Sequence, residues 1–389
     1  MQQIPAIRRA RELGHYVITC DYSPNNPGHV FADEYHNVST TDCEAILRVA
    51  QCLSIDGILA YASDPAAHTA AYVAEKLGLP GPGVSAVDTL TQKDRFRAFL
   101  REHDFNAPCA WGFSSCEEAI AAIGQFELPV MVKPVDSSGS KGVVKVECLE
   151  DYSSAVQEAF FYSRSGRIIV EEFIKKTGYQ ISGDGFSVDG TLVFTSYGNE
   201  LYSNRGTRDY VALGEFWPSL HSDEDLARLD DELQRLISIL GIGTAAYNIE
   251  AVLDEHGEIY IIELAPRNGG SYIPQLISYA TGANLVDFAI KAALGEDCSM
   301  LSRAETHCCV SNYMIYSVES GCFAGLWFDD SFKQNNLLEV HCTCDLGDCV
   351  EAYRNTSHSL GTILFKAPSI EEMEAITGNI DRYVRVLVN

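Results

Sequence analysis

The chain has 389 residues, of which 46% are hydrophobic, and a formal net charge of −26 at pH 7. This length predicts two or three domains, and so large a negative charge disfavours non-specific binding to nucleic acids or anionic membranes. No apolar run is long enough to span a bilayer, and no signal-peptide pattern opens the sequence. We therefore expect a cytoplasmic protein that acts on small molecules, without nucleic-acid or membrane partners.

The first 88 residues predict alternating helices and strands, which is typical of a parallel sheet covered by helices. The expected helices cover residues 4–13, 45–53 and 64–78, and the expected strands cover 15–22 and 56–62. The chain enters at a helix, without the strand and glycine turn that usually precede it in a doubly wound unit. We favour a native segment missing before Met1. A sheet built without that strand is the alternative, and direct pairing of 17–22 with 56–62 would support it.

The rest of the chain predicts antiparallel strands mixed with helices. A turn-rich joint at 78–86 precedes a helix at 89–105 that carries Lys93. Further along we expect hairpins at 130–146, 178–198 and 245–264, a strand at 167–174, helices at 151–163, 223–240 and from about 272, several short strands after 308, and a final helix at 371–384.

The 13 cysteines are scattered, which is typical of reduced cytosolic thiols. One cluster, HCTCDLGDC at 341–349, could suggest a metal, although its spacing is not that of a zinc finger or ribbon. Cys342 and Cys344 also alternate as one face of a strand would. Structural zinc and a plain strand face are therefore the two interpretations.

The stretch VMVKPVDSSGSKGV at 130–143 joins an apolar run to a loop of serines and glycines. Small residues let the backbone approach a ligand and point N–H groups at anionic oxygen, and Lys133 and Lys141 would add positive charge. The loop lacks the spacing of a P-loop. By itself it fits either a phosphate-holding loop or a plain glycine-rich hairpin.

Two glutamates, Glu250 and Glu263, lie on adjacent predicted strands joined by the turn DEHGE. On a hairpin centred near 256–257 they fall opposite each other, as a hard-oxygen site suited to Mg²⁺. Two exposed glutamates are the alternative. However, apolar neighbours such as Ile249 and Leu264 imply that one face of each strand is buried, so the acidic pair needs a cation or another partner.

Basic and small residues follow the second glutamate. Arg267 would place a guanidinium beside the carboxylate pair, as phosphoryl transfer requires to neutralise developing charge. Residues 269–271 precede a predicted helix, whose N-terminus can also hold an anion. Arg205 and Arg208 lie among aromatic residues, where they could clamp a substrate carboxylate or form part of an exposed loop.

In their order and spacing these motifs resemble the ATP-grasp superfamily, specifically the carboxylate–amine ligases similar to biotin carboxylase, carbamoyl-phosphate synthase and L-amino acid ligases. The resemblance covers the chain from about residue 14 to the C-terminus. It implies an α/β and α+β architecture in three parts. These are a Rossmann-like parallel sheet at 1–88, an ATP-grasp domain with a large antiparallel sheet at 89–298 and a lid at about 110–175, and a mainly β subdomain at 299–389.

The resemblance also implies which residues bind ATP. Lys93 and Lys133 would meet its phosphates, the 138–140 loop would cover them, and Gln180 would stand at the ribose position, where the family usually has Glu. Glu171 and the backbone after it would read adenine. The residues implied for ATP are Lys93, Lys133, Ser138, Gly139, Ser140, Glu171, Glu172, Phe173, Ile174 and Gln180.

The remaining roles implied by the resemblance concern the metal, catalysis and the acceptor. Glu250 and Glu263 would bind Mg²⁺ or Mn²⁺, and Arg267 and Lys141 would act at the transferred phosphate. The candidate substrate contacts are Asp64, Arg205, Arg208, Asn268, Gly269 and Ser271.

The implied reaction joins a small-molecule carboxylate to an amine. The carboxylate attacks the γ-phosphate of ATP to give an acylphosphate, and the amine displaces phosphate. The family's Glu-x-Asn-Pro-Arg pattern has Ala265 in place of Asn, so a nucleotide-binding protein that has lost or altered catalysis is the alternative. A dinucleotide-dependent oxidoreductase is disfavoured because no G-x-G-x-x-G follows a strand. A homodimer is one assembly that the resemblance allows.

Overall fold

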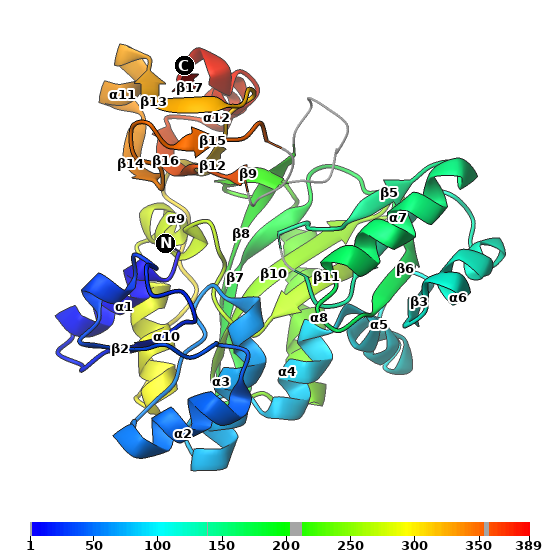
Figure 1. The fold of residues 1–389 in the computed structure, drawn as a ribbon, viewed down its shortest axis with the longest axis horizontal. Helices are drawn as coiled ribbons and strands as arrows, with labels where there is room; N and C mark the ends of the chain where they lie inside the picture. The colour runs from blue at the N-terminus through cyan, green and yellow to red at the C-terminus, as the bar shows by residue number, and fades with distance from the viewer. Residues whose placement is uncertain (1, 138, 203–211, 354–357) are drawn as a thin grey trace.

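The computed structural model describes residues 2–137, 139–202, 212–353 and 358–389. Figure 1 shows a large sheet that crosses the centre of the molecule, with the lid region on one side and the N-terminal helices on the other. The C-terminal strands lie at the far end of this sheet. Within the described ranges, no helix has the length and apolar character needed to cross a membrane.

The elements follow one another along the chain as mixed helices and strands. The helices are α1 (Ile4–Glu12), α2 (Cys43–Leu53), α3 (Asp64–Leu77), α4 (Val84–Thr91), α5 (Lys93–Glu102), α6 (Cys116–Ala121), α7 (Leu149–Tyr162), α8 (Asp223–Leu240), α9 (Ile273–Thr281), α10 (Leu285–Leu294), α11 (Asp330–Asn335) and α12 (Ile370–Thr377). The strands are β1 (Ile18–Cys20), β2 (Glu34–His36), β3 (Ala110–Phe113), β4 (Val130–Pro134), β5 (Val144–Val146), β6 (Ile168–Glu172), β7 (Ile181–Val188), β8 (Thr191–Tyr202), β9 (Ala212–Trp217), β10 (Ala245–Leu253), β11 (Ile259–Ala265), β12 (Cys309–Ile315), β13 (Gly321–Phe328), β14 (Leu337–Cys342), β15 (Cys349–Val350), β16 (Gly361–Ala367) and β17 (Val384–Val388).

The large sheet has eight antiparallel strands in the order β11-β10-β7-β8-β9-β12-β16-β14. The prediction of a large antiparallel sheet is therefore confirmed. Three strands of the C-terminal part belong to this same sheet. The C-terminal part adds only the three-stranded sheet β15-β13-β17 of its own, so its expected mainly β character comes largely from extending the central sheet.

The predicted hairpins form where the turn residues require them. Asp189 and Gly190 join β7 to β8 with φ values of +49° and +83°, the left-handed conformations that a two-residue hairpin turn needs. Gly257, with φ of +77°, lies in the turn between β10 and β11. These turns fix the register of the strands that carry the acidic residues.

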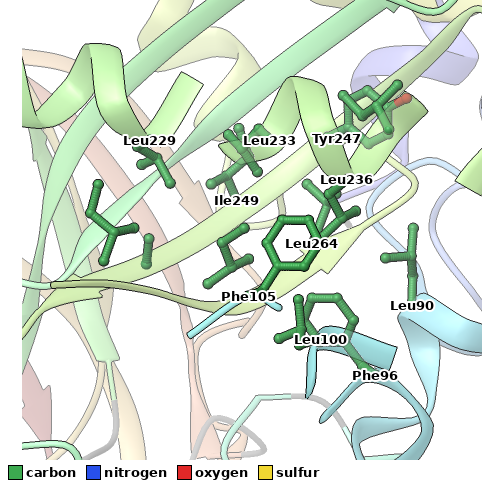
Figure 2. Packing of buried hydrophobic residues seen from close by; sticks show 14 of the residues in the cluster. Leu90, Phe96, Leu100, Phe105, Leu229, Leu233, Leu236, Tyr247, Ile249 and Leu264 are labelled. Carbon is green, nitrogen blue, oxygen red and sulfur yellow. The ribbon is translucent and has the colours of Figure 1, made fainter. Parts of the chain in front are cut away.

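The main core lies between the large sheet and the helices α4, α5 and α8. Tyr247 and Ile249 on β10 are fully buried against Leu233 and its neighbours on α8 (Figure 2). Because side chains alternate along a strand, Asn248 and Glu250 point to the opposite face. The hydrophobic pattern of β10 thus assigns one face to the core and leaves polar groups on the other.

The region expected as a lid, which we continue to call the lid, contains a four-stranded antiparallel sheet, β3-β6-β4-β5, covered by α6 and α7. Val130 pairs with Val146, so the predicted hairpin around the serine-glycine loop is confirmed. Val130, Val132 and Val146 are fully buried against α7. The loop between β4 and β5 is therefore anchored by a packed hairpin at its base.

The N-terminal unit differs from the expected parallel sheet. Ile18 pairs in parallel with Glu34, and this sheet has only the strands β1 and β2. The predicted strand at 56–62 is wrong, because this segment has no ladder partner in the described structure. It also does not pair with β1, and residues of both line a cavity of about 630 Å³. The short strand β2 was not predicted because it lies in a turn-rich stretch.

Two helix predictions also need correction. Residues 84–91, predicted as part of a turn-rich joint and the start of a long helix, form α4, and α5 begins only at Lys93. Gln92 between them has an extended conformation that ends the first helix. The expected domain boundary after residue 88 stays a prediction, and residue 88 lies within α4. The predicted final helix ends at Thr377, and its last residues belong to a 3-10 turn and β17.

Candidate active site

A cavity of about 480 Å³ lies between the N-terminal unit, the lid and the polar face of the large sheet. Its walls include α5, the loop after β4 and strands β7 to β11. Many residues singled out from the sequence line it together: Asp64, Lys93, Lys133, Gly139, Ser140, Lys141, Gln180, Glu250, Glu263, Arg267 and Ser271. Ser138, Arg205 and Arg208 lie outside the described residues.

The two predicted metal-binding glutamates lie directly opposite each other. Glu250 on β10 and Glu263 on β11 are register partners, next to a β-bulge. Directly opposed residues on antiparallel strands have side chains on the same face. The prediction that they face one another is therefore confirmed, and both are half-buried in the cavity wall.

Cations and raised proton affinity balance this acidic pair. Glu263 lies 3.5 Å from Lys93 Nζ and 3.9 Å from an Arg267 guanidinium nitrogen. Burial, together with the charges of Glu200 and Glu263, raises the pKa of Glu250 well above its ordinary value. The nearby cations match the expectation that this acidic pair needs a cation or another partner.

Arg267 is buried, with 8% of its surface exposed, and it organises this end of the cavity. Its Nε donates to Asp64 Oδ1 at 2.6 Å, and Nη1 donates to Asn248 Oδ1 at 2.9 Å. Burial alone would lower the pKa of Arg267, but the charges of Asp64 and Glu263 raise it above the ordinary value. The guanidinium is therefore a fixed positive charge beside the glutamate pair.

A buried ion triad links the lid to α5. Arg97 Nε donates to Glu171 Oε2 at 2.9 Å, and Lys133 Nζ pairs with Oε1 of the same carboxylate. Burial would raise the pKa of Glu171, but Arg97 and Lys133 lower it to about 2. Sequence reasoning gave no role to Arg97, which is 1% exposed. Its position one turn after Lys93, on the apolar stripe with Phe96, was the available signal.

Residues 172–174, which follow Glu171 along the chain, do not line the cavity. Glu172 is exposed and accepts a hydrogen bond from the Cys109 N–H at 3.1 Å. The Phe173 N–H donates to Pro129 O at 3.2 Å. The lid surface of the cavity instead comes from Met131, Lys133 and the following loop. The adenine-reading role of Glu171, Glu172, Phe173 and Ile174 stays a prediction.

Lys93 connects the serine-glycine loop to the acidic pair, and Gln180 contacts the same pair from β7's N-terminal end. Lys93 Nζ donates to Ser137 O at 3.2 Å, while the Ser137 hydroxyl donates to Lys141 O at 2.9 Å. Gln180, the predicted ribose contact, donates from Nε2 to Glu250 Oε2 at 3.1 Å. Lys93 therefore contacts both the loop and Glu263.

Asp184 holds the segment that follows Arg267, a role that sequence reasoning missed. Both of its carboxylate oxygens accept from the Gly269 N–H, at 2.9 and 3.0 Å, and Asn268 donates a side-chain hydrogen bond. Burial raises the pKa of Asp184 to about 6. The signal was an aspartate between two glycines in a predicted strand, which is unusual for a core position.

Ala265 occupies the position where the family pattern has an amide. Asn248 is its register partner on β10, so an amide does lie directly opposite. Asn248 Oδ1 already accepts from Arg267, and its Nδ2 donates to Asp184. Asn248 therefore orients Arg267, and the metal-binding role of Glu250 and Glu263 on these two strands stays a prediction.

The cysteine cluster has ordinary side-chain contacts. The His341 ring stacks on Tyr272, with centroids 3.9 Å apart, and one of its nitrogens lies 2.7 Å from Glu339 Oε2. Cys342 ends β14, and Cys344 packs against the C-terminal core. No group of three or more His, Cys, Asp or Glu suited to a metal occurs in the described part of the chain.

Comparison with known proteins places this geometry in a family. The model of the carbamoyl-phosphate synthase L chain ATP-binding domain matches residues 92–301, more than half of the chain. The carbamoyl phosphate synthase large chain of Halobacterium salinarum is 26% identical over 322 residues, which are 78% of this chain and 29% of that protein. The chain thus spans less than a third of that relative's length.

Solved structures resemble the whole chain. The L-amino acid ligase from Bacillus licheniformis has a TM-score of 0.84 and 24% identity, covering 100% of this chain and 97% of the other. The biotin carboxylase domain of the Hydrogenobacter thermophilus 2-oxoglutarate carboxylase, a dimer in complex with MgADP, ADP and bicarbonate, has a TM-score of 0.73 and 18% identity, covering 100% and 88%. With the family match and the facing glutamates in the cleft, the chain belongs to the ATP-grasp superfamily and carries an ATP-binding domain of the carbamoyl-phosphate synthase L chain type.

Proposed function

We propose that the protein is an ATP-dependent ligase that activates a small-molecule carboxylate as an acylphosphate and joins it to an amine, releasing ADP and phosphate. One observation carries the proposal. Glu250 and Glu263 are directly opposed in a cleft where Lys93 and Arg267 supply positive charge. Hard-oxygen ligands beside fixed cations are what the transfer of a phosphoryl group requires.

The residues present fit a bound Mg²⁺ or Mn²⁺ ion with ATP. Mg²⁺ is usually held by one or two carboxylates together with phosphate oxygens, and Glu250 and Glu263 supply two carboxylates. Burial, with the charges of Glu200 and Glu263, raises the pKa of Glu250, and a bound divalent ion would favour its ionised form. When bound, the metal would neutralise and orient the phosphates of ATP.

The chain's own side chains would then position the reactants. Lys133 and Lys93 project from the lid and α5 into the cleft, where they would hold phosphate oxygens. Arg267, oriented by Asp64 and Asn248, would stabilise charge on the transferred group, and Lys141 would assist from the loop. The mechanism needs positioning and charge neutralisation more than a protein nucleophile, so we assign no general base.

The experiment is a screen followed by one substitution. Phosphate release from ATP is measured with the full-length protein against amino acids, small acids and amines, and the best pair is then tested with Glu263→Gln. This change removes one charge with almost no change in volume, so the protein should fold while Mg²⁺-dependent turnover is abolished. The matched control is Glu258→Gln. It changes an exposed glutamate that, like Glu263, follows the β10–β11 turn in the chain. Normal turnover by Glu263→Gln would refute the metal assignment.

A second function is favoured by Ala265, which removes an amide from the metal-binding strand. A protein that binds nucleotide but has lost or altered catalysis would bind ATP in calorimetry and release no phosphate with any acceptor. Restoring the amide with Ala265→Asn tests this alternative directly. If the substitution creates turnover that the natural chain lacks, the loss of catalysis lies at this position.

A further inference from the structure

Two more glutamates lie on the floor of the same cleft and are not used by the proposed phosphoryl transfer. Glu200 on β8 and Glu215 on β9 are direct register partners, so their side chains share one face. Both line the cavity, and each has only 7% of its surface exposed. They lie two and three strands away from Glu250 in the order of the sheet.

This pair lacks a matching positive charge. In the described residues, neither Glu200 nor Glu215 forms an ion pair within 4.0 Å. Glu200 Oε2 accepts a hydrogen bond from the Tyr202 hydroxyl at 2.7 Å. Lys176, above the Tyr202 ring at 4.5 Å, is the basic residue whose charge acts on Glu200. Directly opposed like charges are destabilising on a sheet.

Glu215 also has a buried oxygen without a partner. Its Oε2 has no hydrogen-bond partner in the described structure and almost no contact with solvent. A buried, unpaired carboxylate oxygen is costly, and nearly all such groups in folded proteins find a donor. Other atoms of Glu215 line the cavity, so a turn of its carboxylate would bring this oxygen to a donor on a ligand there.

The surroundings favour an organic cation over a second metal ion. Asn312 and Tyr202 flank the pair. A metal at Glu250 and Glu263 would gain phosphate oxygens from ATP, whereas no group of three or more His, Cys, Asp or Glu in the described residues would complete a separate metal site here. An ammonium group carries three N–H donors, so it can bond both carboxylates at once. We propose that Glu200 and Glu215 form a subsite for a protonated amino group on the ligase's substrate.

This inference rests on the proposed ligase function and narrows its substrates to acids or amines that carry an ammonium group away from the reacting atoms. It assigns Glu200 and Glu215 a binding role, separate from the metal role of Glu250 and Glu263. The pair would then select amino-group-bearing substrates over otherwise similar neutral ones, because a neutral group leaves both carboxylates unpaired.

The experiment compares acids that differ by one ammonium group. The full-length protein, with Mg²⁺ and ADP, is titrated calorimetrically with three pairs: norleucine and hexanoate, 6-aminohexanoate and hexanoate, and lysine and norleucine. In at least one pair, the acid with the extra ammonium should bind at least tenfold more tightly. Glu215→Gln should remove most of that advantage and leave the other acid unchanged, while Glu258→Gln should preserve the advantage.

Three results would overturn the subsite. No pair shows an advantage for the ammonium, or Glu215→Gln weakens both members of a pair equally, or it raises the Mg²⁺ requirement without changing the advantage. The last result would identify a second metal position. Because binding is measured without turnover, the ammonium subsite can be tested independently of the ligase function. Ammonium selectivity without phosphate release refutes only the ligase, and phosphate release without selectivity refutes only the subsite.

Discussion

Glu171 in the lid and the Glu200–Glu215 pair on the large sheet are similarly buried, yet their surroundings are opposite. Both oxygens of Glu171 meet a cation, and its pKa falls to about 2. Burial raises the pKa of Glu200 to about 7 and that of Glu215 to about 7, and an oxygen of Glu215 has no partner. The first region is complete in the protein alone, whereas the second is complete only with a ligand.

The difference separates a structural carboxylate of the lid from functional carboxylates of the cleft. A paired buried carboxylate stabilises the fold when its partners are present. Its loss leaves the buried cations without a counter-charge. An unpaired buried carboxylate costs stability, and such costs are typical of binding sites. The two regions should therefore respond with opposite signs when their charge is removed, and the following changes test that contrast.

The largest effect on folding is expected at Glu171. Glu171→Ala leaves Arg97 and Lys133 without their carboxylate, so the free energy of unfolding should fall by about 3–5 kcal/mol. Urea unfolding at pH 7 measures this change. Glu147→Ala, which removes a mostly exposed carboxylate just after β5, should stay within about 0.5 kcal/mol. A loss below about 1 kcal/mol for Glu171→Ala would contradict the structural role of the triad.

A substitution at Lys133 tests whether the lid contacts the nucleotide. Lys133→Ala should weaken ATP binding by about tenfold or more, since one charge-assisted contact contributes about 1.5–3 kcal/mol. Glu171 keeps Arg97, so the fold should persist. Calorimetric titration with ATP and Mg²⁺ gives the affinity, and Lys175→Ala at an exposed ion pair serves as the control. Unchanged affinity for ATP would place Lys133 outside the nucleotide site.

Removing the charge of Glu215 should change the free energy of unfolding in the opposite direction to removing the charge of Glu171. Its pKa is raised from 4.5 to about 7 in the folded state, so the folded protein binds a proton more readily than the unfolded chain between these values. The contribution of Glu215 to stability therefore falls as pH rises from about 4.5 to about 7, and the penalty persists above that range. Glu215→Gln should raise the free energy of unfolding at pH 8 by about 1–3 kcal/mol.

Denaturant unfolding at pH 5 and pH 8, with chelator and without nucleotide, measures this effect. The gain from Glu215→Gln should be smaller at pH 5, where Glu215 of the natural chain is already protonated. An equal gain at both pH values would mean that the substitution acts through packing. A loss of stability at pH 8 would mean that the carboxylate has a partner and that the contrast with Glu171 is wrong.

Sequence patterns predicted the parts of this molecule that depend on local rules. Turn chemistry at 189–190 and strand alternation around Glu250 and Glu263 were sufficient to place the hairpins and the acidic pair. The strand expected at 56–62 failed because a strand needs a neighbour, which no local pattern reveals. Arg97, Asp184 and the Glu200–Glu215 pair were missed since their roles depend on partners distant in the sequence.

The smallest effect is expected one residue after Glu171. Glu172 lies on the opposite, exposed side of β6 and bonds the Cys109 N–H, and a glutamine there keeps an acceptor. Glu172→Gln should therefore change the free energy of unfolding by less than about 0.5 kcal/mol and ATP affinity by less than about twofold. If this segment reads adenine, it would do so through the backbone that follows, as the family resemblance implies for Phe173 and Ile174. Urea unfolding and ATP titration measure both quantities.

A tenfold loss of ATP affinity in Glu172→Gln, with stability intact, would show that the exposed carboxylate itself contacts the nucleotide. Consecutive residues on one strand would then both serve the ligand, and burial alone would not distinguish structural from functional carboxylates in this protein.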